Sequence, residues 1–297
     1  MTALRLRDRT LEFAAGRPAL MGIVNANPDS FSDSERLDTL DKQVAHALAL
    51  VADGAAIIDV GGESGVTYTD VSAEDVEAQR VVPLVRALVA EGVLVSVDTW
   101  KAAVTEQVLE AGAHLINDTS GLADVRIAEL CAAAGAALVV MHTRAAPKQV
   151  DFPDYGGDVR GDVRRFLAER CALAIEHGVG EDALVVDPGP DFAKSPAESV
   201  EVLADLRSLQ ELGHPILAAI SRKYFVGAIT GREPQERLAG TLAALGEAAD
   251  AGAAIARVHD VREAADFLAV RTVLRGERPL PEFDSDDERL KWIRYGA

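Results

Sequence analysis

The feature that most constrains the fold of this 297-residue chain is a series of eight short apolar runs. Each run is rich in Val, Ile, Leu and Ala, ends in polar residues or glycine, and is followed by a segment with helical periodicity. The runs recur every 33 residues or so, about the size of one strand–helix unit of a parallel sheet. They occupy residues 19–30, 55–64, 93–101, 113–121, 137–144, 183–190, 214–223 and 253–261.

These runs predict the fold class. Strands that are buried on both faces are continuously apolar, so the pattern favours a parallel sheet covered by helices. Eight such units predict an α/β fold, the TIM (β/α)8 barrel. Ala-Gly pairs at 111–112, 134–135 and 251–252 mark expected helix ends. A doubly wound open sheet is the alternative, but the glycine-rich loop that normally follows its first strand is replaced here by NANPDSFSD.

The ends of the chain predict the domain organisation. The segment LRLRDRTLEF alternates with period two around Asp8-Arg9, which predicts a short N-terminal β-hairpin capping the lower end of the barrel. Since no low-complexity segment divides the chain, residues 1–276 are predicted to form a single barrel domain. Residues 277–297 begin with prolines and an acidic run, which predicts a tail or a short helix.

Composition limits the partners. Thirty Lys and Arg against 48 Asp and Glu give a net charge of −18, and such a field repels nucleic acids and anionic membranes. No uncharged apolar stretch reaches the length of about 18 residues that a membrane span needs. Cys131 and Cys171 are too few for a disulfide scaffold, which favours a reducing compartment. With the charge and the lack of a membrane span, this predicts a cytoplasmic protein with no nucleic-acid or membrane partner. An anionic substrate would require a local cluster of positive groups.

Polar residues end almost every apolar run. The carboxyl ends of barrel strands meet on one face, where the active sites of these folds lie. A single polar residue in such a position can be only a helix cap, but many converging groups predict a site. The strand-end residues are Asn25 with Asp29, Asp59 with Glu63, Asp98, Asn117, His142, Asp187, Arg222 with Lys223, and Arg257 with His259.

One group of strand-end residues predicts a pocket for a flat heterocycle. Asp98, Asn117 and Asp187 offer carboxylate and amide edges, and Lys223 adds a cation. A ring with several N–H donors and nitrogen acceptors needs such partners, because each buried polar group left unpaired costs about 1–3 kcal/mol.

A second group predicts an anion site. Arg257 and His259 are two residues apart on the eighth run, so their side chains leave the strand on the same side. The first run is the neighbour of the eighth in a closed barrel, and it contributes Asn25. Barrels commonly hold phosphate after their seventh and eighth strands, so this is the expected positive cluster.

Other chemistries fit the sequence less well. Lys223 could be the Schiff-base lysine of a barrel aldolase, but it lies next to Arg222 and lacks a dedicated acid partner. Barrel metal hydrolases begin with His-x-His on the first strand, where this chain has Asn25-Ala26-Asn27. His142 could act in catalysis or line the wall of a pocket. Trp100 could pack over a ligand, but packing in the core is the simpler expectation.

Taken together, the runs resemble the dihydropteroate synthases, barrel enzymes of folate biosynthesis. The resemblance covers about residues 20–265 in order. It implies a transferase that condenses 6-hydroxymethyl-dihydropterin diphosphate with p-aminobenzoate, releases pyrophosphate, requires Mg²⁺ and forms a homodimer. The residues that carry it read MGIVNANPDSFSD, IIDVGGES, SVDTWK, INDTSG, MHT, DPG, GHPILAAISRK and RVHDV.

The resemblance also implies roles for individual residues. The implied pterin-binding residues are Asp98, Asn117, Asp187 and Lys223. The implied diphosphate-binding residues are Asn25, Arg257 and His259, and Asn25 is also the implied Mg²⁺ ligand. Phe31, Phe192 and Arg222 lie on the implied p-aminobenzoate side. The implied catalytic residues are Lys223, Asp98 and Asp33, the last in a loop with Asp29 and Ser32 that closes over the second substrate.

Several loops depart from the family pattern. Gly65-Val66-Thr67-Tyr68 replaces Thr-Arg-Pro-Gly, Asp191 replaces a glycine, Tyr224 replaces a small residue, and NANP replaces the usual start of the first loop. These changes affect the p-aminobenzoate side and predict weak sulfonamide binding. They leave open a non-catalytic pterin-binding paralogue, or one with another second substrate. A pterin-dependent methyltransferase shares the Asp and Asn edges, but the SRK and RVHDV runs argue against it.

Overall fold

Eight parallel strands form the centre of the structure, a computed structural model that describes residues 3–26, 39–63, 71–282, 287 and 290. The strands are β3 (Ala19–Asn25), β4 (Ala55–Gly61), β5 (Val95–Asp98), β6 (Leu115–Asp118), β7 (Ala137–Met141), β8 (Leu184–Asp187), β9 (Leu217–Ala219) and β10 (Ile255–Val258). Their order in the sheet is β8-β7-β6-β5-β4-β3-β10-β9. Each lies within one of the predicted apolar runs.

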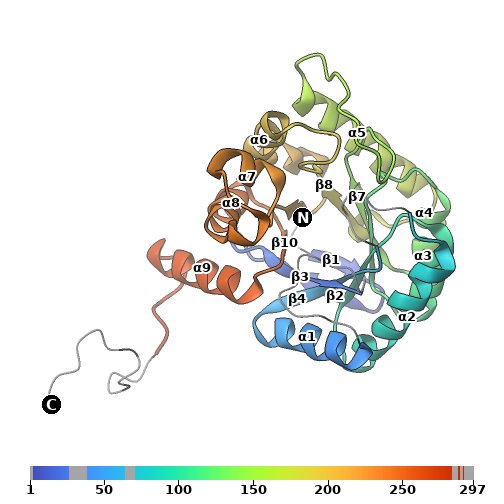
Figure 1. Cartoon of the computed structure of the whole chain (residues 1–297), viewed down its shortest axis with the longest axis horizontal. Helices are drawn as coiled ribbons and strands as arrows, with labels where there is room; N and C mark the ends of the chain where they lie inside the picture. The colour runs from blue at the N-terminus through green and yellow to red at the C-terminus, as the bar shows by residue number, and fades with distance from the viewer. Residues whose placement is uncertain (1–2, 27–38, 64–70, 283–286, 288–289, 291–297) are drawn as a thin grey trace, which may run out of the picture.

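The sheet closes on itself between β8 and β9. Val186 of β8 forms a parallel bridge with Ile216, and its N–H donates to the Pro215 carbonyl at 3.0 Å. With this contact the eight strands surround a central core, as Figure 1 shows from one end. The TIM barrel prediction is confirmed, and the open-sheet alternative is excluded.

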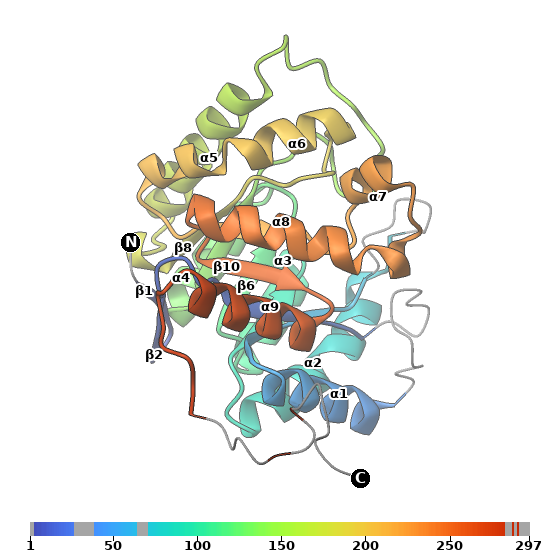
Figure 2. The ribbon, with the colours of Figure 1, turned by 90° about the vertical axis from the view of Figure 1, so that its left-hand side faces the viewer.

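Helices cover the outside of the barrel (Figures 1 and 2). They are α1 (Leu40–Ala52), α2 (Glu74–Ala90), α3 (Ala102–Glu110), α4 (Arg126–Ala134), α5 (Val159–Glu176), α6 (Pro196–Ala204), α7 (Tyr224–Thr230), α8 (Leu238–Ala251) and α9 (Val261–Leu274). Short 3-10 turns lie at η1 (Glu181–Ala183), η2 (Leu206–Leu212) and η3 (Pro234–Glu236). As the Ala-Gly pairs predict, Gly135 and Gly252 end α4 and α8 in the left-handed conformation, with φ of 66° and 88°.

The N-terminal hairpin is present and is displaced by one residue from the predicted turn. Strand β1 (Ala3–Leu6) pairs antiparallel with β2 (Arg9–Glu12), so the turn residues are Arg7 and Asp8. Arg7 has a φ of 59° and donates to the Leu109 and Ala113 carbonyls. These carbonyls lie just before β6, so the hairpin covers the end of the barrel opposite the candidate site.

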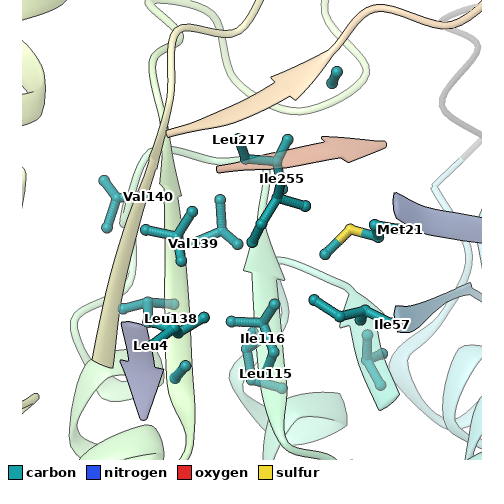
Figure 3. Packing of buried hydrophobic residues seen from close by; sticks show 14 of the residues in the cluster. Leu4, Met21, Ile57, Leu115, Ile116, Leu138, Val139, Val140, Leu217 and Ile255 are labelled. Carbon is teal, nitrogen blue, oxygen red and sulfur yellow. The ribbon is translucent and has the colours of Figure 1, made fainter. Parts of the chain in front are cut away.

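The core is built from buried aliphatic side chains of all eight strands, on both faces of the sheet. Met21, Ile57, Ile116, Val139 and Ile255 are at most 1% exposed and belong to one continuous cluster, to which Leu4 of the hairpin also belongs (Figure 3). Burying each large aliphatic side chain contributes about 1.5–3 kcal/mol. The core therefore fixes the strands and determines which polar residues are presented where they end.

The C-terminal part gives no test of the predicted domain limit. Helix α9 ends at Leu274, and most of residues 283–297 lie outside the described residues, so the boundary at 276 stays a prediction. Among the described residues, every helix is too short or too polar to cross a bilayer.

Candidate active site

The residues predicted to hold a flat heterocycle come together at the carboxyl ends of the strands. Asp98 ends β5 and is paired in register with Asn117 of β6, while Asp187 ends β8. Lys223 is the N-cap of α7, after β9, and its ammonium interacts electrostatically with both Asp98 and Asp187. A pocket of about 200 Å³ lies over this group and is lined by Asp98, Lys223 and Phe192.

A buried hub holds the base of this pocket together. Arg257 of β10 donates from Nε to Asp59 Oδ2 at 2.6 Å and from Nη2 to Asp98 Oδ2 at 3.0 Å. Asn117 Nδ2 donates to the same Asp59 oxygen at 3.2 Å. Asp59 therefore positions two predicted site residues. The sequence places Asp59 at a strand end without assigning it a role, although a lone acid inside the apolar β4 run was a signal.

The acids at the base are shifted toward their neutral forms. Burial raises the pKa of Asp98 to about 7, opposed by the Arg257 charge and reinforced by Asp59. Burial also raises the pKa of Asp187, although the Gly189 N–H that donates to Asp187 Oδ1 at 2.7 Å opposes the shift. A carboxyl group near its pKa can donate a hydrogen bond when it is protonated and accept one when it is ionised, so these side chains can bond either kind of polar ring atom.

Two buried oxygens at the base have no hydrogen-bond partner among the described residues: Asp59 Oδ1 and Asn117 Oδ1. Asp59 is fully buried and Asn117 is 2% exposed. An unpaired buried acceptor costs about 1–3 kcal/mol, so both oxygens favour a ligand that carries N–H donors. Both residues lie beneath the pocket and are joined to it through Arg257 and Asp98.

The two lysines near the pocket have different environments. Lys223 Nζ donates to the Pro190 carbonyl at 3.1 Å and lies 4.4 Å from the centre of the Phe192 ring. Lys194 Nζ is instead surrounded by carbonyls, including those of Gly189 at 2.9 Å and Phe192 at 3.0 Å. Burial lowers the pKa of both lysines, that of Lys194 to about 7. Lys223 therefore lies at the pocket, and Lys194 fixes the loop that carries Phe192.

The predicted anion site carries less charge than the sequence indicates. Arg257 is engaged by Asp59 and Asp98, as described above. His259 Nδ1 is 2.9 Å from Ser221 Oγ, and burial together with the Arg222 charge lowers the pKa of His259 to about 3. His259 is therefore neutral at pH 7 and offers a ring N–H donor in place of a positive charge.

Asn25 ends β3 beside Gly61 of β4, which is in turn paired with Asp98. Its amide supplies one neutral oxygen, and the described residues contain no group of three or more His, Cys, Asp or Glu that could hold a metal ion. Mg²⁺ usually takes one or two protein ligands together with substrate phosphates and water. The donor set therefore fits Mg²⁺ that arrives with a diphosphate and does not fit a permanently bound metal.

The residues predicted on the p-aminobenzoate side are only partly placed. Phe192 lines the pocket. Arg222 has a φ of 57° and its guanidinium binds Asp260 at 2.6 and 3.2 Å. Its predicted contact with the second substrate stays untested. Phe31 and Asp33 lie outside the described residues, as do Asp29, Ser32 and the segment 65–68.

The structure also adds residues that sequence reasoning did not assign to the site. Trp100 lines the pocket and is only partly buried, so the simpler expectation of core packing is wrong and the alternative position over a ligand is favoured. Lys148, from the long loop after β7, lines the same pocket and lies 3.6 Å from Glu63. Lys101 joins Glu63 and Glu77 at 2.6 Å each, which ties the end of β4 to α2. The sequence signal for Lys148 is weak, because the loop has no regular periodicity.

His142 lies in the wall behind the site. Its ring is fully buried, contacts Phe166 edge-on and is bonded through Nε2 to Asp162 at 2.9 Å. Burial lowers the pKa of His142 to about 3. Of the two roles that the sequence leaves open, this environment favours the structural one.

Comparison with known proteins agrees with this geometry. A family described as pterin binding enzyme matches residues 21–259. The dihydropteroate synthase of Bacillus subtilis (strain 168) is 39% identical over 266 residues, which are 89% of this chain and 88% of that protein. The enzyme of the same name from Escherichia coli (strain K12) is 38% identical over 255 residues, 85% and 90% of the two chains.

Solved structures give the same result. The dihydropteroate synthase of Xanthomonas albilineans with 4-aminobenzoic acid has a TM-score of 0.85 at 40% identity, over 94% of this chain and 99% of that chain. Its complex with 7,8-dihydropteroate has a TM-score of 0.81 at 39% identity, over 94% and 100% of the two chains. The chain therefore belongs to the family of pterin-binding enzymes that includes the dihydropteroate synthases.

Proposed function

We propose that this protein is a dihydropteroate synthase, which joins 6-hydroxymethyl-dihydropterin diphosphate to p-aminobenzoate and releases pyrophosphate in folate biosynthesis. The observation that carries the proposal is a pocket lined by Asp98 and Lys223 in a chain of this family, with Asn117 paired in register with Asp98 and Asp187 in electrostatic contact with Lys223. Solved relatives that bind 4-aminobenzoic acid and 7,8-dihydropteroate support it.

In this proposal the base of the pocket holds the pterin. The unpaired Asp59 Oδ1 and Asn117 Oδ1 accept N–H groups of the ring, alone or through water, and Asp187 accepts at another edge. Lys223, which lies beside Phe192 at the pocket, donates to a ring acceptor. The ring is thus fixed with its CH2–O bond directed toward the second substrate.

The diphosphate side assists the departure of the leaving group. The C–O bond breaks with its electron pair going to pyrophosphate, and Arg257 and His259 donate hydrogen bonds to the departing oxygens. Asn25 would be the protein ligand of Mg²⁺ brought with the substrate, and that ion would supply positive charge to the diphosphate. The amine nitrogen of p-aminobenzoate then bonds to the CH2 carbon and loses one proton. This amine is neutral at pH 7, so the step requires no strong base.

The test is a coupled assay of pyrophosphate release with both substrates and Mg²⁺. The proposal predicts release that depends on p-aminobenzoate, and loss of release in Lys223→Ala. A protein that binds a pterin analogue and releases no pyrophosphate would instead be a non-catalytic paralogue. That alternative rests on one observation, the acid Asp191 in the pocket lining where the family pattern has glycine.

We also propose that the protein forms a homodimer in the cytoplasm. Helix α9 exposes Val270 and Leu274, which are 59% and 82% exposed. With Phe267 and Leu242 they line an apolar groove of about 710 Å³ between α8 and α9, and a second copy of the chain would cover it. The two cysteines, Cys131 and Cys171, are buried and free, which suits a reducing compartment. Light scattering should give a mass of twice 31.4 kDa, whereas a monomer mass would contradict the dimer.

A further inference from the structure

Asp191 occupies an unusual backbone position. It lies in the loop after β8 with a φ of 67°, in the left-handed region that favours glycine. Its N–H donates to Ser199 Oγ at 2.9 Å. Its carboxylate accepts the backbone N–H of Tyr224 and, at 3.3 Å, that of Phe225. These bonds hold the loop after β8 against the start of α7 and offset the cost of the left-handed backbone.

The same residue also borders the pocket. Asp191 lines the pocket together with Phe192 and Lys223. The carbonyl of the preceding residue, Pro190, accepts from Lys223 Nζ at 3.1 Å. Asp191 is also the strongest of the charged groups that stabilise the Lys223 ammonium. A negative charge thus lies beside the cation that an anionic second substrate would approach.

The contacts give this charge two effects. It partly neutralises Lys223, which reduces the attraction of the pocket for anions. It also uses the backbone donors at the start of α7, so they are not available to another carboxylate. The charge effect weakens the binding of an amine that carries a carboxylate and does not act on an uncharged amine of the same shape. The occupied donors affect any group that accepts hydrogen bonds, so only the charge effect discriminates between the two amines.

We propose that Asp191 determines the specificity of this site for its second substrate, by disfavouring anionic arylamines relative to neutral ones. The inference rests on the proposed function for the identity of the reaction, and it concerns a residue that departs from the family pattern. Asp191 acts on Lys223 through its charge, so removing that charge should lower KM for an anionic amine more than KM for a neutral one.

The test compares the native protein with Asp191→Asn, which removes the charge and keeps one oxygen acceptor and a side chain that tolerates positive φ. The amines are p-aminobenzoate and its neutral amide, p-aminobenzamide. We expect KM for p-aminobenzoate to fall about tenfold in Asp191→Asn, with KM for the amide changing by less than about twofold. Asp191→Gly should act in the same direction, because glycine suits the backbone. Equal changes for both amines, or none, would overturn the inference.

A matched control removes the same charge elsewhere. Glu201 lies on α6 with 48% of its side chain exposed, where it pairs with Arg160 at 3.8 Å. Glu201→Gln should leave both KM values unchanged. If it lowers KM for p-aminobenzoate as much as Asp191→Asn does, net charge explains the effect and the inference fails.

Direct binding separates this inference from the proposed function. If neither protein releases pyrophosphate, the proposed function fails, and calorimetric titration of p-aminobenzoate into the protein loaded with a pterin analogue still tests Asp191. The inference predicts that p-aminobenzoate binds about tenfold more tightly to Asp191→Asn than to the native protein. Added salt should reduce this difference in affinity, because salt screens the interaction between charges. An unchanged dissociation constant contradicts it.

Discussion

The base and the rim of the pocket are built in different ways. The base consists of strand-end residues, Asp98, Asn117 and Asp187, whose positions follow from the register of the barrel. The rim consists of the loop after β8 and the start of α7, and its residues Asp191 and Tyr224 depart from the family pattern. Loops can vary without disturbing the core, whereas strand ends cannot. If the proposed function holds, substitutions at the base should affect the first substrate, and substitutions at the rim should affect the second.

The largest effect should come from the base. Asp187→Ala removes a buried carboxylate, and we expect it to weaken binding of a pterin analogue at least about 100-fold, since a hydrogen bond to a charged group contributes about 1.5–3 kcal/mol and several are affected. Lys223→Ala should have a similar effect. Calorimetry measures both, and circular dichroism checks that the variants fold. Unchanged pterin affinity would overturn the assignment of the pocket.

The hub beneath the pocket should matter for stability as well as binding. Asp59→Ala leaves Arg257 with Asp98 alone and removes the acceptor of Asn117 Nδ2. Breaking a fully buried ion pair costs about 3–5 kcal/mol, but water reaches one-fifth of the Arg257 side chain and lowers this cost. We therefore expect the free energy of unfolding, measured by urea denaturation, to fall by about 2–3 kcal/mol. Asp59→Asn should lose less. A variant as stable as the native protein would show that the hub does not hold the base in place.

The raised pKa of Asp98 predicts a pH dependence. Its value of about 7 in the folded protein lies above the ordinary 3.8, so the folded state holds a proton that the unfolded chain has lost. This contribution to stability is full below about pH 4 and is lost as pH rises toward 7. Relative to Asp98→Asn, the native protein should lose as much as about 1.4 kcal/mol per pH unit across that window. Parallel stability curves would contradict the shift.

The smallest effect should come from the rim. Tyr224 begins α7 and is 59% exposed. Tyr224→Ser should change KM for p-aminobenzoate by less than about threefold and leave pterin affinity unchanged, because surface substitutions away from buried contacts usually have small effects. Steady-state kinetics and calorimetry give the two values. A large loss of pterin affinity in this variant would show that the rim and the base are not separate.

The sequence predicts the base well, for a physical reason. Strand ends are marked by a change from apolar to polar residues, and the barrel brings all of these ends to one face. Asp98, Asn117, Asp187 and Lys223 could therefore be placed together before the structure was known. The hairpin turn was displaced by one residue, because alternating patterns fix the strands more firmly than the turn between them.

Contacts between distant side chains could not be predicted in this way. Arg257 pairs with Asp59 across 198 positions of the sequence, and no local pattern encodes that pairing. Burial lowers the pKa of His259 and removes its charge. The alternation of apolar and polar residues in the sequence does not show how deeply a side chain at a strand end is buried. The sequence shows only that Asp191 departs from the family pattern. The structure adds that its carboxylate accepts hydrogen bonds from backbone N–H groups at the start of α7.

The most direct test of this account is a crystal structure of the protein with the pterin diphosphate bound. We predict that the N–H groups of the ring lie within hydrogen-bond distance of Asp187 and Asn117, with Lys223 at a ring acceptor and the diphosphate directed toward Arg257. A pterin bound elsewhere, or bound with these side chains untouched, would contradict the account.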